Sequence, residues 1–239
     1  MVADMAEVAT SAPGVRDNQR IVFEASLMWP WIVANCVAFT IAGAIGGGVF
    51  RALLEPSFGR DFPVMEAARI QATAAGFGGA IHGLIIGTAQ WLVLRRSIRA
   101  GWWMPATVVG WTLAGSLMAF SAGGSTSHIG PRDGPINPFI AILLLPPLLA
   151  LILGAGQWLI LRREAAAVGW WPFVSAGAQV GAWFAGLIVA KLLPWVAGTM
   201  YPSGRALAVV GLITGPLYAW LTWQFLAQLR RRAAGPEVS

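Results

Sequence analysis

The chain has 239 residues, of which 57% are hydrophobic and 11% are charged. Soluble domains carry about 25% charged residues, so this composition excludes a water-soluble globular fold and predicts a lipid environment. The net charge is +6, but the arginines follow apolar runs in pairs and triplets, which is typical of membrane helix ends and not of a nucleic-acid-binding face. A single cysteine, Cys36, excludes an intrachain disulfide and a cysteine-based metal site.

Residues 1–26 form a polar N-terminal segment, which we expect to be a disordered cytoplasmic tail without a cleaved signal peptide. Six apolar segments follow, each long enough to cross a bilayer, which takes about 20 residues. They cover residues 27–50, 72–94, 104–122, 139–161, 171–193 and 206–229. Because these runs are continuous and not alternating, they predict transmembrane helices. Pro146–Pro147 predicts a kink in the fourth helix, and Pro216 predicts a local distortion in the sixth.

Arginine clusters follow the second, fourth and sixth segments, whereas the alternate loops are nearly balanced in charge. By the positive-inside rule, both termini and the tail at 230–239 lie in the cytoplasm. Three outer loops are then expected at 51–71, 123–138 and 194–205. This arrangement predicts a multi-pass protein of a bacterial inner (cytoplasmic) membrane.

One stretch of sequence occurs twice. "GTAQWLVLRR" at 87–96 returns as "GAGQWLILRR" at 154–163, and "GWW" follows each copy. The offset of 67 residues carries Gln90 onto Gln157, and "WPW" at 29–31 opens the first apolar segment as "GWW" opens the third and fifth. We therefore predict an all-α, polytopic bundle of six transmembrane helices, built as three two-helix hairpin repeats at about 27–96, 102–163 and 170–232. Since each repeat has an even number of spans, the repeats are parallel.

The pattern GxxQWLxLRR followed by GWW resembles an uncharacterised group of multi-pass membrane proteins from cyanobacteria and related bacteria. The resemblance rests on residues 87–103 and 154–171, with weaker support from 29–31 and 218–232. That group implies a topology but no activity.

The motif residues have ordinary roles in a membrane. Gln90 and Gln157 are expected to hydrogen-bond across helices, with a shared ligand-binding cavity as the alternative. The aromatic and basic side chains are expected to anchor the membrane interface. These anchors are Trp91, Arg95, Arg96, Trp102, Trp103, Trp158, Arg162, Arg163, Trp170 and Trp171.

Two further residues are candidates for ligand binding. His82 is the histidine inside an apolar segment, and an intramembrane ionisable residue is a candidate functional site. We expect a neutral imidazole bonded to a neighbouring helix and no cofactor, with an axial ligand to haem or chlorophyll as the alternative. Lys191 lies near the end of the fifth segment, where snorkelling to the interface competes with contact to an anion or lipid.

Catalysis has little support in the sequence. It contains no HExxH, no P-loop and no paired carboxylates within a span, and Ser116 lacks an orienting acid and a base at its depth. We expect a non-enzymatic scaffold or accessory subunit that packs against another membrane protein or a second copy through small-residue tracks such as Gly177–Gly181 and Gly211–Gly215. The alternative is a small-ligand binding or transport protein with a site inside the bundle.

Overall fold

All regular secondary structure in the described residues of the computed structural model is helical. The structure describes residues 25–57, 62–95, 97–98, 101–122, 138–163, 168–192 and 204–234. The short 3₁₀ helices Ala25–Leu27 and Glu55–Ser57 flank the first α-helix. The α-helices are α1 (Met28–Leu54), α2 (Val64–Leu94), α3 (Trp103–Ala122), α4 (Pro138–Leu161), α5 (Trp171–Leu192) and α7 (Gly204–Ala234).

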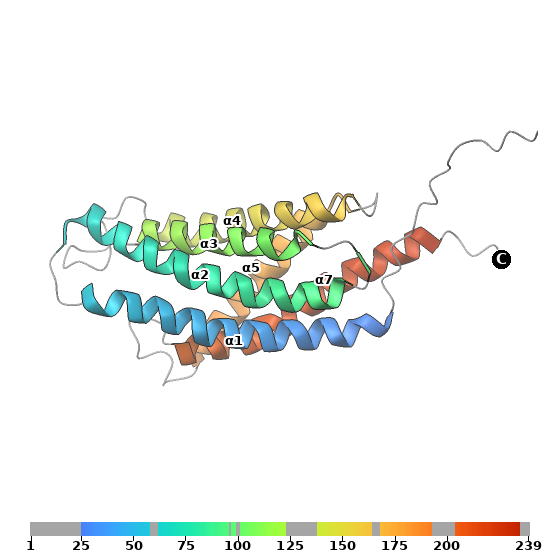
Figure 1. Cartoon of the computed structure of the whole chain (residues 1–239), viewed down its shortest axis with the longest axis horizontal. Coiled ribbons are helices and arrows are strands. Elements are labelled where there is room, and N and C mark those ends of the chain that lie inside the picture. The colour runs from blue at the N-terminus through green and yellow to red at the C-terminus, as the bar shows by residue number, and fades with distance from the viewer. Residues whose placement is uncertain are drawn as a thin grey trace, which may run out of the picture.

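The six helices form a closed ring. Each packs against the next one along the chain, from α1 to α5, then α5 packs against α7, and α7 closes the ring against α1 (Figure 1). We call the end at which α2 and α4 finish beside Arg95 and Arg162 the arginine end, and the opposite end the far end. Helices α1, α3 and α5 begin at the arginine end, and α7 finishes there, as its position in the ring requires.

The outer surface of the bundle is strongly apolar. On α1, Val33, Val37, Ile41 and Ile45 lie four residues apart and are 43–56% exposed, so one whole helical face is directed outward. Soluble proteins rarely expose contiguous apolar patches of more than a few hundred Å². Five helices of the described part are also long and apolar enough to cross a membrane, namely Met28–Ser57, Met65–Leu94, Trp103–Phe120, Leu144–Leu161 and Gly204–Ala227. The chain is therefore a multi-pass membrane protein, although α5 is not among these five helices.

The predicted all-helical fold is confirmed, but the expected loop at 51–71 is largely helical. Helix α1 continues to Leu54, and α2 begins at Val64, directly after Pro63. Proline suits the start of a helix because its missing N–H has no intrahelical acceptor there. Apolar length alone could not show this, because a helix can continue past the bilayer with charged side chains in water. Most of the expected tail at 1–26 and of the expected loops at 123–138 and 194–205 lies outside the described residues. The parts that are described, 25–26, 138 and 204–205, are helical.

Glycines set the closest helix contacts. A Cβ on Gly211 of α7 would overlap the carbonyl oxygen of Phe39 on α1, and a Cβ on Gly83 of α2 would lie 2.8 Å from the carbonyl oxygen of Thr107 on α3. Such contacts agree with the small-residue tracks expected from the sequence. Gly177 and Gly181 differ, because nothing lies within 4 Å of a Cβ built on either. The prolines of α4 and α7 lie within helices that remain continuous.

Candidate functional site

Three buried tryptophans connect neighbouring helices near the arginine end. Trp31, Trp103 and Trp171 are at most 1% exposed. The indole N–H of Trp103 donates to Gln90 Oε1 at 2.9 Å, and that of Trp171 donates to Gln157 Oε1 at 3.2 Å. The indole N–H of Trp31 donates to the Thr222 hydroxyl at 3.2 Å. The bonds join α3 to α2, α5 to α4 and α1 to α7, so each satisfies a donor that would otherwise be buried without a partner.

A polar residue stands four positions after each of these tryptophans, on the same helix face. Gln90 Nε2 donates to Asn35 Oδ1 at 2.7 Å, and Gln157 Nε2 lies 3.5 Å from Thr107 Oγ1. Ser175 Oγ lies 3.2 Å from the hydroxyl of Tyr218. These contacts join α1 to α2, α3 to α4 and α5 to α7, which are the pairs that the tryptophan bonds leave unlinked.

The ten side chains together form what we call the polar belt. Its members are Trp31, Asn35, Gln90, Trp103, Thr107, Gln157, Trp171, Ser175, Tyr218 and Thr222. The Tyr218 hydroxyl also hydrogen-bonds to the side chain of Gln90, which ties the two sets of contacts together. No buried side-chain nitrogen or oxygen among the described residues lacks a hydrogen-bond partner. The belt is therefore a satisfied, uncharged network, which rigidifies a bundle more than isolated pairs do.

The belt shows where the two motif glutamines lie. Gln90 and Gln157 are each 1% exposed, and their polar atoms are directed at neighbouring helices and do not line either of the cavities described below. The expected hydrogen bonds across helices are present at both positions. A shared cavity between the two glutamines is not seen among the described residues, so the structure gives no support to their ligand-binding role.

The expected interface anchors separate into two groups. Trp102 and Trp170 are 71% and 67% exposed, whereas Trp103 and Trp171 are buried, in contrast to the expectation that all four lie at the interface. Consecutive residues of a helix point about 100° apart, which allows the first tryptophan of each GWW to face outward while the second faces the bundle.

The rings of Trp91 and Trp158 each contact an arginine side chain four residues later in the chain. The guanidinium of Arg95 lies 5.4 Å from the ring centroid of Trp91, and that of Arg162 lies 4.9 Å from Trp158. Cation–π contacts of this kind contribute about 0.5–1 kcal/mol at exposed sites. Arg163 is exposed beside them, and Arg96 lies outside the described residues.

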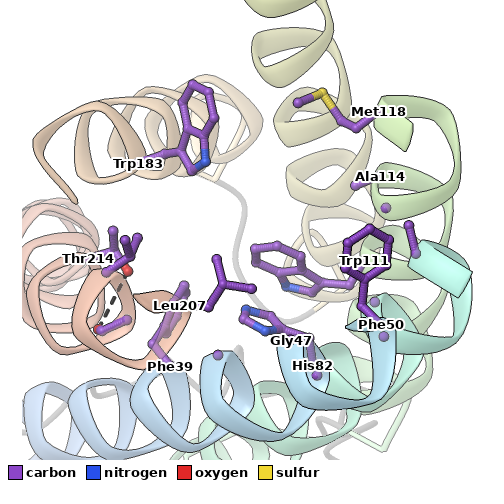
Figure 2. A pocket seen from close by; sticks show the side chains of 18 of the residues that line it. Phe39, Gly47, Phe50, His82, Trp111, Ala114, Met118, Trp183, Leu207 and Thr214 are labelled. Carbon is purple, nitrogen blue, oxygen red and sulfur yellow. Dashed lines mark hydrogen bonds between the residues drawn. The ribbon is translucent and has the colours of Figure 1, made fainter. Parts of the chain in front are cut away.

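A cavity of about 370 Å³ occupies the far half of the bundle. Five helices surround it, α1, α2, α3, α5 and α7, and its largest walls are aromatic (Figure 2). The aromatic lining residues are Phe39, Phe50, His82, Trp111 and Trp183. A smaller cavity of about 110 Å³ between α3, α4 and α5 shares part of this wall, including Trp111, Trp183 and Gln179.

His82 lies on the wall of the larger cavity. Its ring centroid is 4.3 Å from that of Trp111, and Phe39 meets it edge-on at 6.0 Å. The imidazole also hydrogen-bonds to the backbone of Ala42 on α1. This is the interhelical bond expected from the sequence, and the same ring faces the cavity, where Figure 2 shows it beside Trp111.

The other candidates add little to the site. Lys191 belongs to α5, but its side chain lies outside the described residues. The described residues contain no group of three or more histidine, cysteine, aspartate or glutamate side chains that could hold a metal ion.

Sequence reasoning missed Trp31, Tyr218 and Thr222 as polar contacts and all the large aromatic residues of the cavity. The spacing Trp–x–x–x–Asn, Thr or Ser occurs at 31–35, 103–107 and 171–175 and could have revealed part of the belt. The cavity has no comparable signal, because an aromatic residue that lines a cavity and one that faces lipid look alike in sequence. No protein-family model, curated protein or solved structure matches this chain.

Proposed function

We propose that the protein binds a small molecule in the central cavity of its membrane bundle. The observation that carries this proposal is the cavity of about 370 Å³ lined by five helices, which falls within the range of about 300–1,000 Å³ typical of ligand sites. The polar belt packs the arginine half, and the cavity lies on residues 75–82 of α2 and 207–214 of α7, in the far half. The bundle is thus closed at one end and hollow toward the other, as a receptor for a captured molecule requires.

We further propose that the bundle consists of three hairpin repeats, α1–α2, α3–α4 and α5–α7. Three features of the polar belt recur and support this idea. The first helix of each hairpin carries a buried tryptophan and a polar residue four positions later. The tryptophan donates to an acceptor on the helix that precedes its own in the ring. The third hairpin departs from the pattern, because Thr222 accepts the bond, whereas Gln224, which stands 67 residues after Gln157, is exposed. With the arginine end in the cytoplasm, the cavity lies in the outer half of the membrane.

Retention of the native ligand tests the binding proposal. Three proteins are compared: wild type, Ala114→Phe and Leu113→Phe. Each is purified from its own membranes in lipid nanodiscs and released from them inside a native mass spectrometer. Ala114 lines both cavities, whereas its neighbour Leu113 is 44% exposed on the outer face of α3. We expect a bound mass on wild type and Leu113→Phe that Ala114→Phe lacks. The same bound masses on all three proteins, or none on any, would rule the proposal out.

A second candidate function is a scaffold or accessory subunit that packs against another membrane protein or a second copy. Gly177 and Gly181 favour it, since they are exposed on α5 with open space before them, whereas the glycines of the other tracks contact a helix. Native mass spectra of wild type and Gly181→Leu distinguish the two cases. Loss of a bound subunit in Gly181→Leu alone would support the scaffold, and an unpartnered wild-type monomer would count against it.

A further inference from the structure

The composition of the cavity wall defines the class of ligand. Resting on the proposed function, we infer that the cavity binds an uncharged, largely apolar molecule with a planar ring system and a hydrogen-bond-accepting oxygen. Three features of the wall carry this inference: its lack of charge, its aromatic surfaces and its hydrogen-bond donors.

The wall carries no Asp, Glu, Lys or Arg among the described residues that line it. Its polar side chains, apart from the indoles, are His82, Gln179 and Thr214. An ionised group transferred into such a site loses its hydration without gaining a counter-ion, which is strongly unfavourable. The cavity therefore selects against carboxylates, phosphates and ammonium groups.

The large faces of the wall are flat. Trp183 enters from α5 and Trp111 from α3, and in Figure 2 they border the same central space with His82 next to Trp111. Aromatic rings prefer offset-stacked or edge-to-face neighbours, which a planar ring offers and a puckered saturated ring does not. Apolar cavities smaller than this one are known to bind benzene.

Three hydrogen-bond donors of the wall have no acceptor within the described residues, whereas His82 bonds to the backbone of Ala42 and the Thr214 hydroxyl donates to that of Gly211. All three tryptophans of the polar belt donate to a protein acceptor, whereas the Trp111 and Trp183 indoles and the Gln179 amide make no hydrogen bond there. An indole N–H can only donate, so its natural ligand partner is an acceptor such as a carbonyl or ether oxygen. Both indoles and Gln179 line the larger and the smaller cavity, which places these donors at the junction of the two.

Three probes of similar size separate these features. 2-Acetylnaphthalene is neutral, planar and carries a carbonyl, 2-naphthoate is its charged counterpart, and 2-acetyldecalin is its saturated counterpart. Binding to nanodisc-embedded protein is measured by equilibrium dialysis as the difference between wild type and Ala114→Phe, which removes partition into lipid. Leu113→Phe is the matched control.

We expect saturable binding of 2-acetylnaphthalene to wild type and to Leu113→Phe, with affinities at least about tenfold weaker for the other two probes. Gln179→Leu should weaken 2-acetylnaphthalene several-fold and leave unsubstituted naphthalene unchanged, since only the former offers an acceptor. If Ala114→Phe does not fold, as judged by circular dichroism, Ala119→Leu fills the same cavity.

The outcomes separate the two levels of the proposal. If 2-naphthoate or 2-acetyldecalin binds in the cavity as tightly as 2-acetylnaphthalene or more tightly, the ligand class is wrong but small-molecule binding stands. Tight binding of 2-acetyldecalin would indicate a lipid chain as the occupant. If no probe shows a difference between wild type and the filled variants, and no native ligand is retained, the proposed function itself fails.

Discussion

Among single residues, Gln90 of the polar belt joins two neighbouring helices to its own. Gln90 contacts α1 through Asn35 and α3 through Trp103, and both contacts are buried. The amide of Gln90 therefore supplies the hydrogen bonds that the side chains of Asn35 and Trp103 would make to water if the helices were apart. The sequence predicted this role for Gln90, because glutamine in an apolar run has few favourable alternatives to an interhelical bond.

Replacing Gln90 with leucine should destabilise the bundle. Gln90→Leu leaves the Trp103 indole N–H and the side-chain oxygen of Asn35 without these bonds. Each such buried group costs about 1–3 kcal/mol when it is unpaired. The free energy of unfolding is measured by steric trapping in bicelles. Gln224→Leu is the control, since Gln224 is exposed on α7. Equal stability of both variants would show that the belt bonds contribute nothing to folding.

Among the helices, the α1–α7 contact closes the ring, and it is built on backbone-to-backbone approach. Gly211 faces the carbonyl oxygen of Phe39, and Gly215 faces that of Asn35, with no space for a side chain between the helices. The spacing of glycines in α7 suggested a packing face, but the sequence did not identify α1 as the partner. That choice depends on ring closure, which no local pattern encodes.

A methyl group at this contact should separate the two helices. Gly211→Ala is expected to destabilise the protein by about 1–3 kcal/mol, because its Cβ meets a backbone carbonyl that cannot rotate away. Gly181→Ala is the matched control on α5, where a Cβ meets nothing within 4 Å, so its stability should be unchanged or slightly higher. Thermal aggregation in detergent measures both. A Gly211→Ala protein as stable as wild type would contradict this packing.

For the whole molecule, apolar segments of sufficient length predicted the helices well, because lipid leaves a continuous apolar chain no other way to satisfy its backbone. The extra turns at Leu54 and Val64 escaped prediction, since they lie beyond the apolar runs. Trp103 and Trp111 show the limit for the site: hydropathy treats them alike, yet one closes the belt and the other lines the cavity. Only the packing of all six helices separates these roles.

The orientation of the bundle follows from its arginines and is testable by labelling. In a Cys36→Ala background, Glu55→Cys marks the far end, and Gly101→Cys marks the arginine end, at exposed positions. We expect a membrane-impermeant maleimide to label Glu55→Cys in intact cells and Gly101→Cys only after permeabilisation. The reverse pattern would place the arginine end outside.

Photolabelling tests the cavity site most directly. A diazirine derivative of 2-acetylnaphthalene is activated on the nanodisc-embedded protein, and the labelled residues are mapped by peptide mass spectrometry. We expect adducts on cavity residues such as Ala114, Met118 and Trp183 that excess 2-acetylnaphthalene suppresses. Adducts confined to outward-facing residues such as Val109 and Leu113, and unaffected by competitor, would contradict a binding site inside the bundle.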